Sequence, residues 1–511
     1  MKTAEICMLI VIVLYLAAMV IIGAVYSKKN KSSDDFFLGG RKLGPLVTAM
    51  SAEASDMSSW LLMGLPGVAL LAGLAEASWT AIGLAIGTYL NWLIVAKRIR
   101  NYSARLGAFT VPDFFSKRFK DNKSILSLVS ALIIIVFFVP YTASGFSACG
   151  KLFNSLFCVD YVTAMIISAV VIVLYTTLGG FLAASVTDLV QSIVMTAALI
   201  VVLFFGINSA GGWSNVVENA KALPGYLNLT NTYNPETHNA VGYNGLTIAS
   251  TLAWGLGYFG MPHILLRFMA IKDSGKLKTS RRIASVWVVI SMTVAIIIGV
   301  VGCAMVDCGA VTGLEDSERI IIAIAKLIGE NGVFAALFAG MILAGILAAT
   351  MSTADSQLLA ASSSASQNIM HDFLKIKVTA KKEMVIARVT VVIIAVIAVF
   401  MSLNQNSSVF RVVSFAWAGF GAAFGPVVLF SLFWKRTNKW GALAGMLTGG
   451  VMVFVWKFVI RTAFVGTLLD IYELLPAFIL ACIAIVIVSL CTKAPEKEIT
   501  EEFDEVCAMQ N

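Results

Sequence analysis

Long apolar segments follow one another along almost the whole of this 511-residue sequence. A run of about 20 apolar residues has the length of a helix that crosses the hydrocarbon core of a bilayer, where backbone polar groups must be bonded within the protein. Hydrophobic residues make up 59% of the chain and charged residues 13%, which excludes an ordinary soluble domain. The sequence therefore predicts an all-α polytopic protein of the lipid bilayer.

We predict thirteen membrane-spanning helices in a single integral membrane domain. Their approximate bounds are 4–26, 45–70, 75–96, 125–150, 161–178, 188–208, 246–270, 283–306, 333–367, 385–403, 409–434, 441–463 and 472–491. A tail at 492–511 follows the last helix, and its acidic stretch at 496–505 is expected to be a solvated end.

Lysine and arginine residues collect in alternate loops, which indicates the orientation in the membrane. Clusters follow the first, third, seventh, ninth and eleventh predicted helices, whereas the long loop after the sixth contains only Lys221. Because positive loops stay in the cytoplasm, this pattern predicts an external N-terminus and a cytoplasmic C-terminus. The net charge of +8 is then a topology signal and not a footprint for nucleic acid. The first and ninth loops contribute Lys28, Lys29, Lys31, Arg41, Lys42, Lys375, Lys377, Lys381 and Lys382.

Several classes of function are disfavoured by what the sequence does not contain. There is no GxxxxGK[ST] phosphate-binding loop and no loop long enough for a nucleotide-binding domain. No pairing of a nucleophile with a histidine base is apparent, so we expect no enzyme activity. Any active transport by this chain would therefore draw its energy from an ion gradient.

Two of the predicted helices contain the glycine and proline residues that break a helix. The second contains Gly64, Pro66 and Gly67, and the seventh has a glycine-rich stretch, 255–260, before Pro262. Broken helices at matching positions of two inverted repeats form the binding sites of many secondary transporters. Because the two helices are five apart, we expect inverted five-helix repeats at 45–208 and 246–434. Helix 4–26 and helices 441–491 would then be additions at either end.

Acidic residues inside predicted membrane helices are costly and usually functional. Glu53, Asp56, Asp188 and Asp355 form this group, and Asp56 is the strongest candidate because it lies about 17 Å along its helix, near mid-membrane. In the ninth helix Ser352, Asp355 and Ser356 share one face, which favours an ion-binding face. The alternative is that such hydroxyl groups only bond to their own backbone or to a neighbouring helix.

Other polar and aromatic residues allow a structural and a functional interpretation. Trp254 and Tyr258 lie mid-helix beside the second break, which favours a substrate-facing wall over a membrane-interface belt. His263 is expected to be a packing or pore-lining group, and Arg267 is expected to extend its charge toward the cytoplasmic surface. From composition alone, Arg41 is expected to be one of the positive loop charges that set the orientation in the membrane.

At these positions the sequence resembles the sodium:solute symporters, and within them most closely the sodium/proline symporters. The likeness covers nearly the whole chain and is specific because several motifs occur together. They are FLGGR at 37–41, ASDMS at 54–58, WLLMGLPG at 60–67, the stretch 175–188, WGLGYF at 254–259, LAATMST at 347–353 and AWAGFGAAFGP at 416–426.

The resemblance implies a LeuT-like core of inverted five-helix repeats that works by alternating access, and it implies roles for individual residues. A sodium ion would be bound by the carbonyls of Ala54, Met57 and Ala349 and the hydroxyls of Ser352 and Thr353. Asp56 would act in sodium coupling, and Arg41 and Asp188 would be important near the cytoplasmic side. Asp188, Asp355 and Ser356 resemble a second sodium site of some relatives. Proline-binding positions would be Ser58, Trp60, Tyr141, Trp254 and Tyr258.

These expectations describe a sodium-coupled symporter of a plasma membrane, such as a bacterial inner membrane, that imports L-proline and works as a monomer or a weak oligomer. Glu53 and Ser59 stand where related proline carriers have small residues, and Met261 replaces a glutamine, so substrate and sodium stoichiometry stay open. The alternatives are sodium-coupled import of another small amino acid or a monocarboxylate, proton coupling, or a membrane sensor that does not transport.

Overall fold

The computed structural model describes residues 2–27, 33–376 and 379–509 of the chain. The predicted topological charges Lys28, Lys29, Lys31 and Lys377 lie outside these residues, and the side chain of Lys381 is also outside them. The described residues are mostly helical, with one short pair of strands. The all-α prediction is therefore confirmed.

Ten helical segments within the described residues are long and apolar enough to cross a membrane. One of them runs from α5 (Leu74–Leu90) through the π-helical turn η3 (Asn91–Val95) into α6 (Ala96–Arg105). The others are built on α1 (Thr3–Ser27), α8 (Ile125–Phe157), α9 (Tyr161–Ser209), α13 (Leu277–Asp307), α15 (Val333–Ser363), α16 (Ala380–Met401), α17 (Val409–Phe433), α18 (Lys439–Val455) and α20 (Leu474–Cys491).

Two further apolar segments are interrupted, at the positions where the sequence predicts broken helices. The first consists of α3 (Pro45–Ser59), the π-helical turn η2 (Trp60–Gly64) and α4 (Leu65–Ala72). The second consists of α11 (Gly245–Leu252), the 3-10 segment η4 (Ala253–Gly260) and α12 (Pro262–Ala270). Ser58 has φ 49° and ψ −171°, a conformation that ends the first helix. Both predicted breaks are confirmed.

Helix α9 combines two predicted membrane helices. Its 49 residues would extend about 74 Å as one straight helix, far more than a bilayer core of about 30 Å. Gly180, with φ 65° and ψ −168°, interrupts it where the sequence predicts a turn between helices. Counting its two parts and the two broken segments would give thirteen crossings, a number that stays a prediction.

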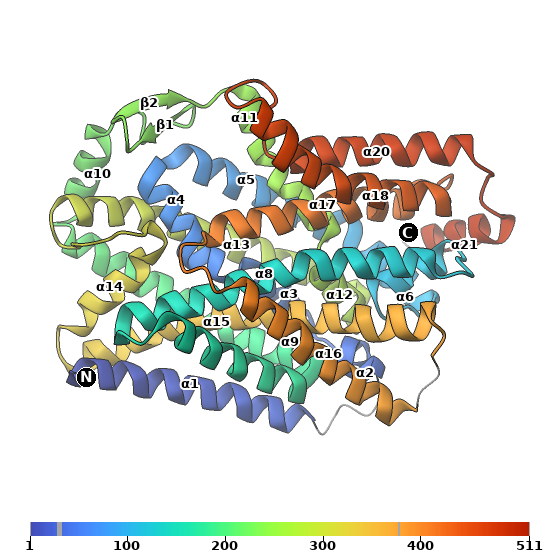
Figure 1. Cartoon of the computed structure of the whole chain (residues 1–511), viewed down its shortest axis with the longest axis horizontal. Coiled ribbons are helices and arrows are strands. Elements are labelled where there is room, and N and C mark those ends of the chain that lie inside the picture. Colours follow the sequence, from blue (N-terminus) through green and yellow to red (C-terminus); the bar gives the residue numbers. More distant parts are fainter. Residues whose placement is uncertain (1, 28–32, 377–378, 510–511) are drawn as a thin grey trace.

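The short elements gather at the two ends of the helical bundle (Figure 1). The end with the N-terminus and the strands is called the hairpin end, and the end with the C-terminus the tail end. The hairpin end carries α10 (Trp213–Ala222), β1 (Asn231–Asn234), β2 (Asn239–Gly242), η6 (Ser317–Arg319), α14 (Ile320–Gly329), η8 (Trp456–Ile460) and α19 (Arg461–Ala463). The tail end carries α2 (Ser33–Leu38), η1 (Gly39–Arg41), α7 (Val111–Arg118), η5 (Ser274–Lys276), η7 (Ser364–Phe373) and α21 (Lys497–Ala508).

Helix α15 forms the centre of the bundle. It packs against α9, α1, α3 and α8. Every residue from Ile342 to Ser363 is buried. Its small residues allow this close packing, as at Gly345, where an added Cβ would meet the methyl group of Ala198 at 2.8 Å. Large apolar side chains are exposed on the outside of the bundle, for example Phe204, Phe334 and Phe400, as expected for surfaces that contact lipid.

The acidic tail is not simply solvated, so that expectation is wrong. It folds into α21, whose Ile499, Phe503 and Val506 are buried against the bundle. The Arg118 guanidinium lies 5.3 Å from the centre of the Phe503 ring. Ion pairs join the helix to basic residues of the tail end, namely Arg105 with Glu502 and Glu505, Lys120 with Glu498, and Lys435 with Asp504. The spacing of the apolar residues 499, 503 and 506 is typical of an amphipathic helix, and it is the sequence feature that could have predicted α21.

Candidate functional site

The predicted sodium-binding residues lie where the broken helix α3 meets α15. The Ser352 hydroxyl donates to the Ala54 carbonyl at 2.8 Å and lies 3.1 Å from the Ala349 carbonyl. The Thr353 hydroxyl donates to Ala349 at 3.2 Å. The Met57 carbonyl accepts the Trp60 amide at the break. Carbonyl and hydroxyl oxygens from two helices form the kind of donor set that sodium uses in broken-helix transporters.

Asp56 is buried two residues before Ser58, where the helix breaks, and two tyrosines bond to it. The Tyr258 hydroxyl donates to Asp56 Oδ2 at 2.6 Å, and the Tyr141 hydroxyl donates to the Asp56 carbonyl at 3.2 Å. The three residues come from α3, η4 and α8, so the contacts join both broken segments to a third helix. Hydrogen bonds to an ionised carboxylate are stronger than those between neutral groups.

An aromatic cluster covers the break. The ring centres of Trp60 and Trp254 are 5.6 Å apart, and both rings contact Phe410. Trp254 stacks on Tyr472 with ring centres 5.3 Å apart and planes 20° apart. The Trp417 indole donates to the Trp254 carbonyl at 2.7 Å. The predicted substrate residues Trp60 and Trp254 therefore lie side by side, with aromatic neighbours that the sequence did not single out.

A vestibule of about 1610 Å³ leads from the hairpin end to this aromatic cluster. Gly64, Trp254, Phe410 and Tyr472 are among its lining residues. Its walls also carry charged groups that are paired, such as Lys151 with Glu318 at 3.0 Å. Beyond the cluster, Ser58, Tyr141 and Thr353 are among the residues around a narrow gap that is too small for a water molecule.

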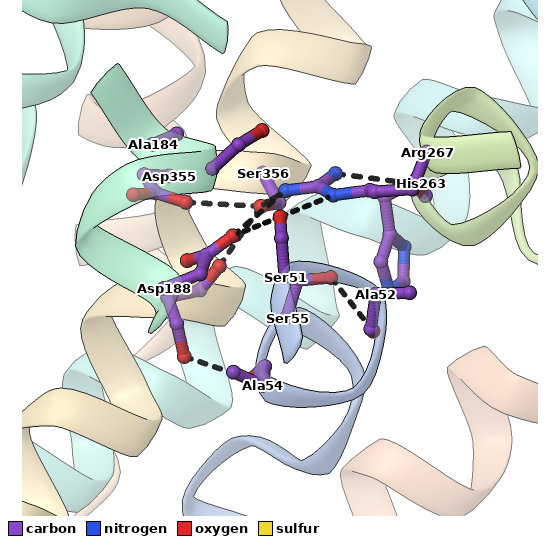
Figure 2. Close-up of polar contacts among 12 residues, drawn as sticks. Ser51, Ala52, Ala54, Ser55, Ala184, Asp188, His263, Arg267, Asp355 and Ser356 are labelled. Carbon is purple, nitrogen blue, oxygen red and sulfur yellow. Dashed lines mark hydrogen bonds and ion pairs between the residues drawn. The ribbon is translucent and has the colours of Figure 1, made fainter. Parts of the chain in front are cut away.

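On the tail-end side of the break, a buried polar network is centred on Arg267 (Figure 2). Its Nη2 lies 3.1 Å from Asp188 Oδ2 and 2.5 Å from the Ser356 hydroxyl, and its Nε donates to Ser51 at 3.0 Å. Ser51 in turn donates to Asp188 at 2.6 Å. These residues come from α12, α9, α15 and α3, so the Arg267 network joins four helices.

The position of Arg267 contradicts its sequence interpretation. Its side chain is 1% exposed and does not extend to the surface, because α12 packs against α3 and α15 and carries the guanidinium into the bundle. The residues predicted as a second sodium site, Asp188, Asp355 and Ser356, do come close together. Asp188 and Ser356 contact the Arg267 cation directly, and Asp355 accepts from Tyr175 at 2.8 Å and from Ser356 at 3.0 Å.

Arg41 joins loops at the tail end. Its guanidinium donates to the carbonyl groups of Met269 at 2.6 Å, Ala108 at 2.5 Å and Ser103 at 3.1 Å. Arg41 thus ties η1 to the end of α12 and to the segment between α6 and α7. It lies away from the Asp56 cluster.

His263 in α12 and Glu53 in α3 are also buried. Within the described part of the chain, neither ring nitrogen of His263 has a hydrogen-bond partner. Its ring centre lies 5.6 Å from that of Phe138, in line with a packing role. Glu53 Oε1 accepts from the Trp92 indole at 2.9 Å. Trp92, Tyr175, Phe410 and Tyr472 were not predicted as site residues, because a single aromatic residue in an apolar helix carries no signal in the sequence.

Two interrupted helices meet a cluster of buried oxygen atoms halfway along the bundle, at the foot of a vestibule open at one end. In a multi-pass membrane protein these features define a secondary transporter.

Comparisons with known proteins identify its family. Residues 36–449 match the sodium:solute symporter family. The chain is 44% identical over 486 residues to the osmoregulated proline transporter OpuE of Bacillus subtilis, covering 95% of this chain and 94% of that protein. It is 42% identical over 508 residues to the sodium/proline symporter of Escherichia coli, covering 98% and 96%. This chain belongs to the sodium:solute symporter family.

A solved structure supports the fold. The chain superposes with a TM-score of 0.79 on a substrate-bound outward-open sodium-coupled sialic acid symporter, covering 96% of this chain and 99% of that one, at 18% sequence identity. Since the identity is low, this likeness concerns the fold alone. The LeuT-like architecture implied by the sequence is confirmed.

Proposed function

We propose that this protein imports L-proline together with sodium by alternating access. The names of the relatives above, which match along almost their whole length, favour proline and sodium. The arrangement of Asp56 between Tyr258 and Tyr141, at the break of α3, carries the proposal. It links a buried negative charge to both interrupted helices.

In this proposal one sodium ion binds between α3 and α15. The carbonyls of Ala54, Met57 and Ala349 and the hydroxyls of Ser352 and Thr353 would coordinate it. The direct contacts of Ser352 with Ala54 and Ala349 support this, because these oxygens already face one another. Sodium would join two helices that move relative to each other, so proline and sodium would raise each other's affinity by the same factor.

Proline would bind beside the break. Trp60, Trp254 and Tyr258 offer aromatic surfaces for its apolar ring, while Ser58 and Tyr141 offer hydroxyl groups. The amide groups that begin the helix after the break favour a carboxylate, because they carry partial positive charge. Asp56, through its negative charge, would favour both sodium and the positively charged imino nitrogen of proline.

Alternating access would require the two ends of the bundle to open in turn. The vestibule reaches the aromatic cluster from the hairpin end, while the Arg267 network joins α3, α9, α12 and α15 on the other side. Opening toward the tail end would therefore break the ion pair between Arg267 and Asp188. Arg41 would act at the tail end by holding the α6–α7 segment to α12.

The orientation is part of the proposal. The hairpin end, with the N-terminus, would face outward, and the tail end, with its basic clusters and the C-terminus, would face the cytoplasm of a bacterial cell. The segments 45–208 and 246–434 would be the two inverted repeats. We assign transport and no catalytic step to the protein, and a monomer contains all the residues invoked.

The test is binding of radiolabelled proline to the purified protein in sodium and in potassium buffers. Proline should bind only in sodium, and Tyr258→Phe should weaken binding. Competition by unlabelled small amino acids and monocarboxylates would rank the alternatives. Displacement by another solute and not by proline would reject proline as the substrate, and equal binding in potassium would reject sodium coupling.

A further inference from the structure

A groove of about 480 Å³ runs along the outside of the bundle where α9 packs against α13. One wall is α13, with Val286, Ile290 and Val294 on successive turns, and the other is α9, with Leu199 and Ile200. We call it the α9–α13 groove. Val286 is 60% and Ile290 54% exposed, so the groove opens to the surroundings of the bundle and not into its interior.

The walls of the α9–α13 groove select an apolar occupant. The Trp287 indole donates to the Thr196 hydroxyl at 2.9 Å, and the Ser291 hydroxyl donates to the Val288 carbonyl at 3.2 Å, so the polar groups there already have partners. Water needs two to four polar partners to occupy a cavity, and an empty groove would forfeit dispersion contacts. Since α13 is long and apolar enough to cross a membrane, the material around it is lipid, and an acyl chain is the fitting occupant.

The groove has the length of one leaflet of a bilayer. Along α13 its lining residues extend from Arg282 to Val294, a distance of about 18 Å in a helix. Half of a hydrocarbon core is about 15 Å thick. Helix α13 begins at the tail end with Leu277, directly after η5, and the predicted membrane helix begins at 283, next to Arg282. The groove therefore extends from the tail-end surface of the membrane toward its middle.

A cation lies at the tail-end rim of the groove. Arg282 is exposed there, and among the described residues no hydrogen bond or ion pair engages its guanidinium. The neighbouring Arg281 instead lies over the Tyr89 ring, 5.1 Å from its centre. A guanidinium binds phosphate oxygens in a bidentate way, and basic pockets between membrane helices bind anionic lipid head groups.

We propose that the α9–α13 groove binds a phospholipid with an anionic head group. One acyl chain lies along Val286, Ile290 and Val294, and Arg282 binds the phosphate. The chain alone gives little preference for this lipid over others, because all lipid tails are similarly apolar. The charge of Arg282 supplies the selection, which is about 5-fold for one basic residue at an anionic surface.

The groove also reaches the interrupted helix α3. Met50 of α3 is one of its lining residues, and the next residue, Ser51, bonds to Arg267 and Asp188. The bound lipid thus contacts the helix that carries the break, on the tail-end side. A lipid that binds one position of α3 better than another shifts the balance between them. The lipid site itself concerns the outer surface of the bundle and does not depend on which solute the protein carries.

The experiment is native mass spectrometry of the purified full chain in detergent, with equal amounts of phosphatidylglycerol and phosphatidylcholine. The native protein should retain phosphatidylglycerol in preference. Arg282→Gln should weaken this binding about 5-fold, whereas Lys278→Gln, one turn earlier on α13, should not. Ile290→Trp should fill the groove and weaken binding about 10-fold. Its control is Val289→Trp, because Val289 is 51% exposed on the same helix and does not line the groove.

Two results of this experiment would overturn the inference. One is equal retention of the two lipids by the native protein. The other is weaker binding in Arg282→Gln with native binding in Ile290→Trp, because a phosphate would then bind at the surface with no chain in the groove. Neither result bears on proline transport.

A fluorescence measurement covers the case in which one of these variants does not fold. In liposomes of phosphatidylcholine, a small fraction of phosphatidylglycerol brominated in its acyl chains should quench the indole of Trp287, which lines the groove. Trp287→Phe should remove that part of the quenching. Brominated phosphatidylcholine at the same fraction should quench Trp287 less. Equal quenching by the two brominated lipids, or no quenching that Trp287→Phe removes, would overturn the inference.

Discussion

The hydroxyl group of Tyr258 tests the role of Asp56 with the smallest change. Tyr258→Phe removes the 2.6 Å hydrogen bond to the Asp56 carboxylate and keeps the ring that packs on Trp417. A hydrogen bond to a charged group contributes about 1.5–3 kcal/mol, which corresponds to roughly a 10- to 100-fold change. We expect the sodium concentration for half-maximal proline uptake to rise by at least about 10-fold.

The control for this substitution is Tyr233→Phe. Tyr233 lies in the β hairpin, where its hydroxyl bonds to His238 at 2.7 Å, and the change should leave uptake as it is. If Tyr258→Phe kept native sodium dependence, Asp56 would not need this hydrogen bond for coupling.

Arg267 and Asp188 permit a test that separates stability from transport. Arg267→Met leaves Asp188 buried without its ion pair, and breaking a buried pair costs about 3–5 kcal/mol. We expect a clearly lower Tm in detergent for Arg267→Met. The double variant Arg267→Met, Asp188→Asn should recover part of the Tm, because both charges of the ion pair are removed together, but not the sodium-coupled uptake. Equal Tm values for the single variant and the native protein would contradict the ion pair.

At the residue scale the sequence singled out buried acids and hydroxyl groups because such groups are rare in apolar helices, and their role in binding stays a prediction. The contacts of Ser352 with Ala54 and of Tyr258 with Asp56 had to come from the structure. Arg267 was misread for a physical reason. Its place near the end of a predicted helix suggested access to the surface, and only the packing of α12 against its neighbours shows that the guanidinium is enclosed.

At the scale of elements, the 3-10 segment η4 depends on glycine residues for its close packing. A Cβ at Gly257 would overlap the indole of Trp417, which donates to the Trp254 carbonyl. Gly257→Ala should therefore displace the aromatic wall and reduce proline uptake by at least about 10-fold. Uptake into proteoliposomes with equal amounts of protein measures this effect.

Gly242→Ala is the matched control for Gly257→Ala. Gly242 lies in β2, and a Cβ there would have no heavy atom within 4 Å, so transport should not change. Native uptake by Gly257→Ala would show that Trp417 can move aside and that its position does not set the shape of the site.

The elements differ in how much their sequence revealed. Both broken helices were predicted because glycine and proline interrupt an apolar run, and the structure places the breaks in those stretches. The sequence predicts two helices with a turn between them, whereas the structure joins both in α9. The two are continuous because the single residue Gly180 makes the turn. Amphipathic helices such as α7 and α21 were not predicted, because their apolar residues alternate with polar ones and form no continuous apolar run.

At the scale of the whole molecule, α21 packs the end of the chain against the tail end. Exposed ion pairs contribute at most about 1 kcal/mol each, so its buried Phe503 and Ile499 should provide most of the attachment. Phe503→Ser should release the helix and increase its cleavage by a protease, whereas Glu498→Gln should have little effect. Cleavage of both variants at the native rate would show that the docked helix is not held by its apolar face.

The central claim is that an inward sodium gradient drives proline through this protein. The most direct measurement is uptake of radiolabelled proline into proteoliposomes, with sodium outside and potassium inside, beside a control with potassium on both sides. We expect proline to accumulate above its external concentration only with the sodium gradient, and Asp56→Asn to abolish accumulation in folded protein. Proline uptake that does not depend on the sodium gradient, or no proline uptake by folded native protein, would contradict the account.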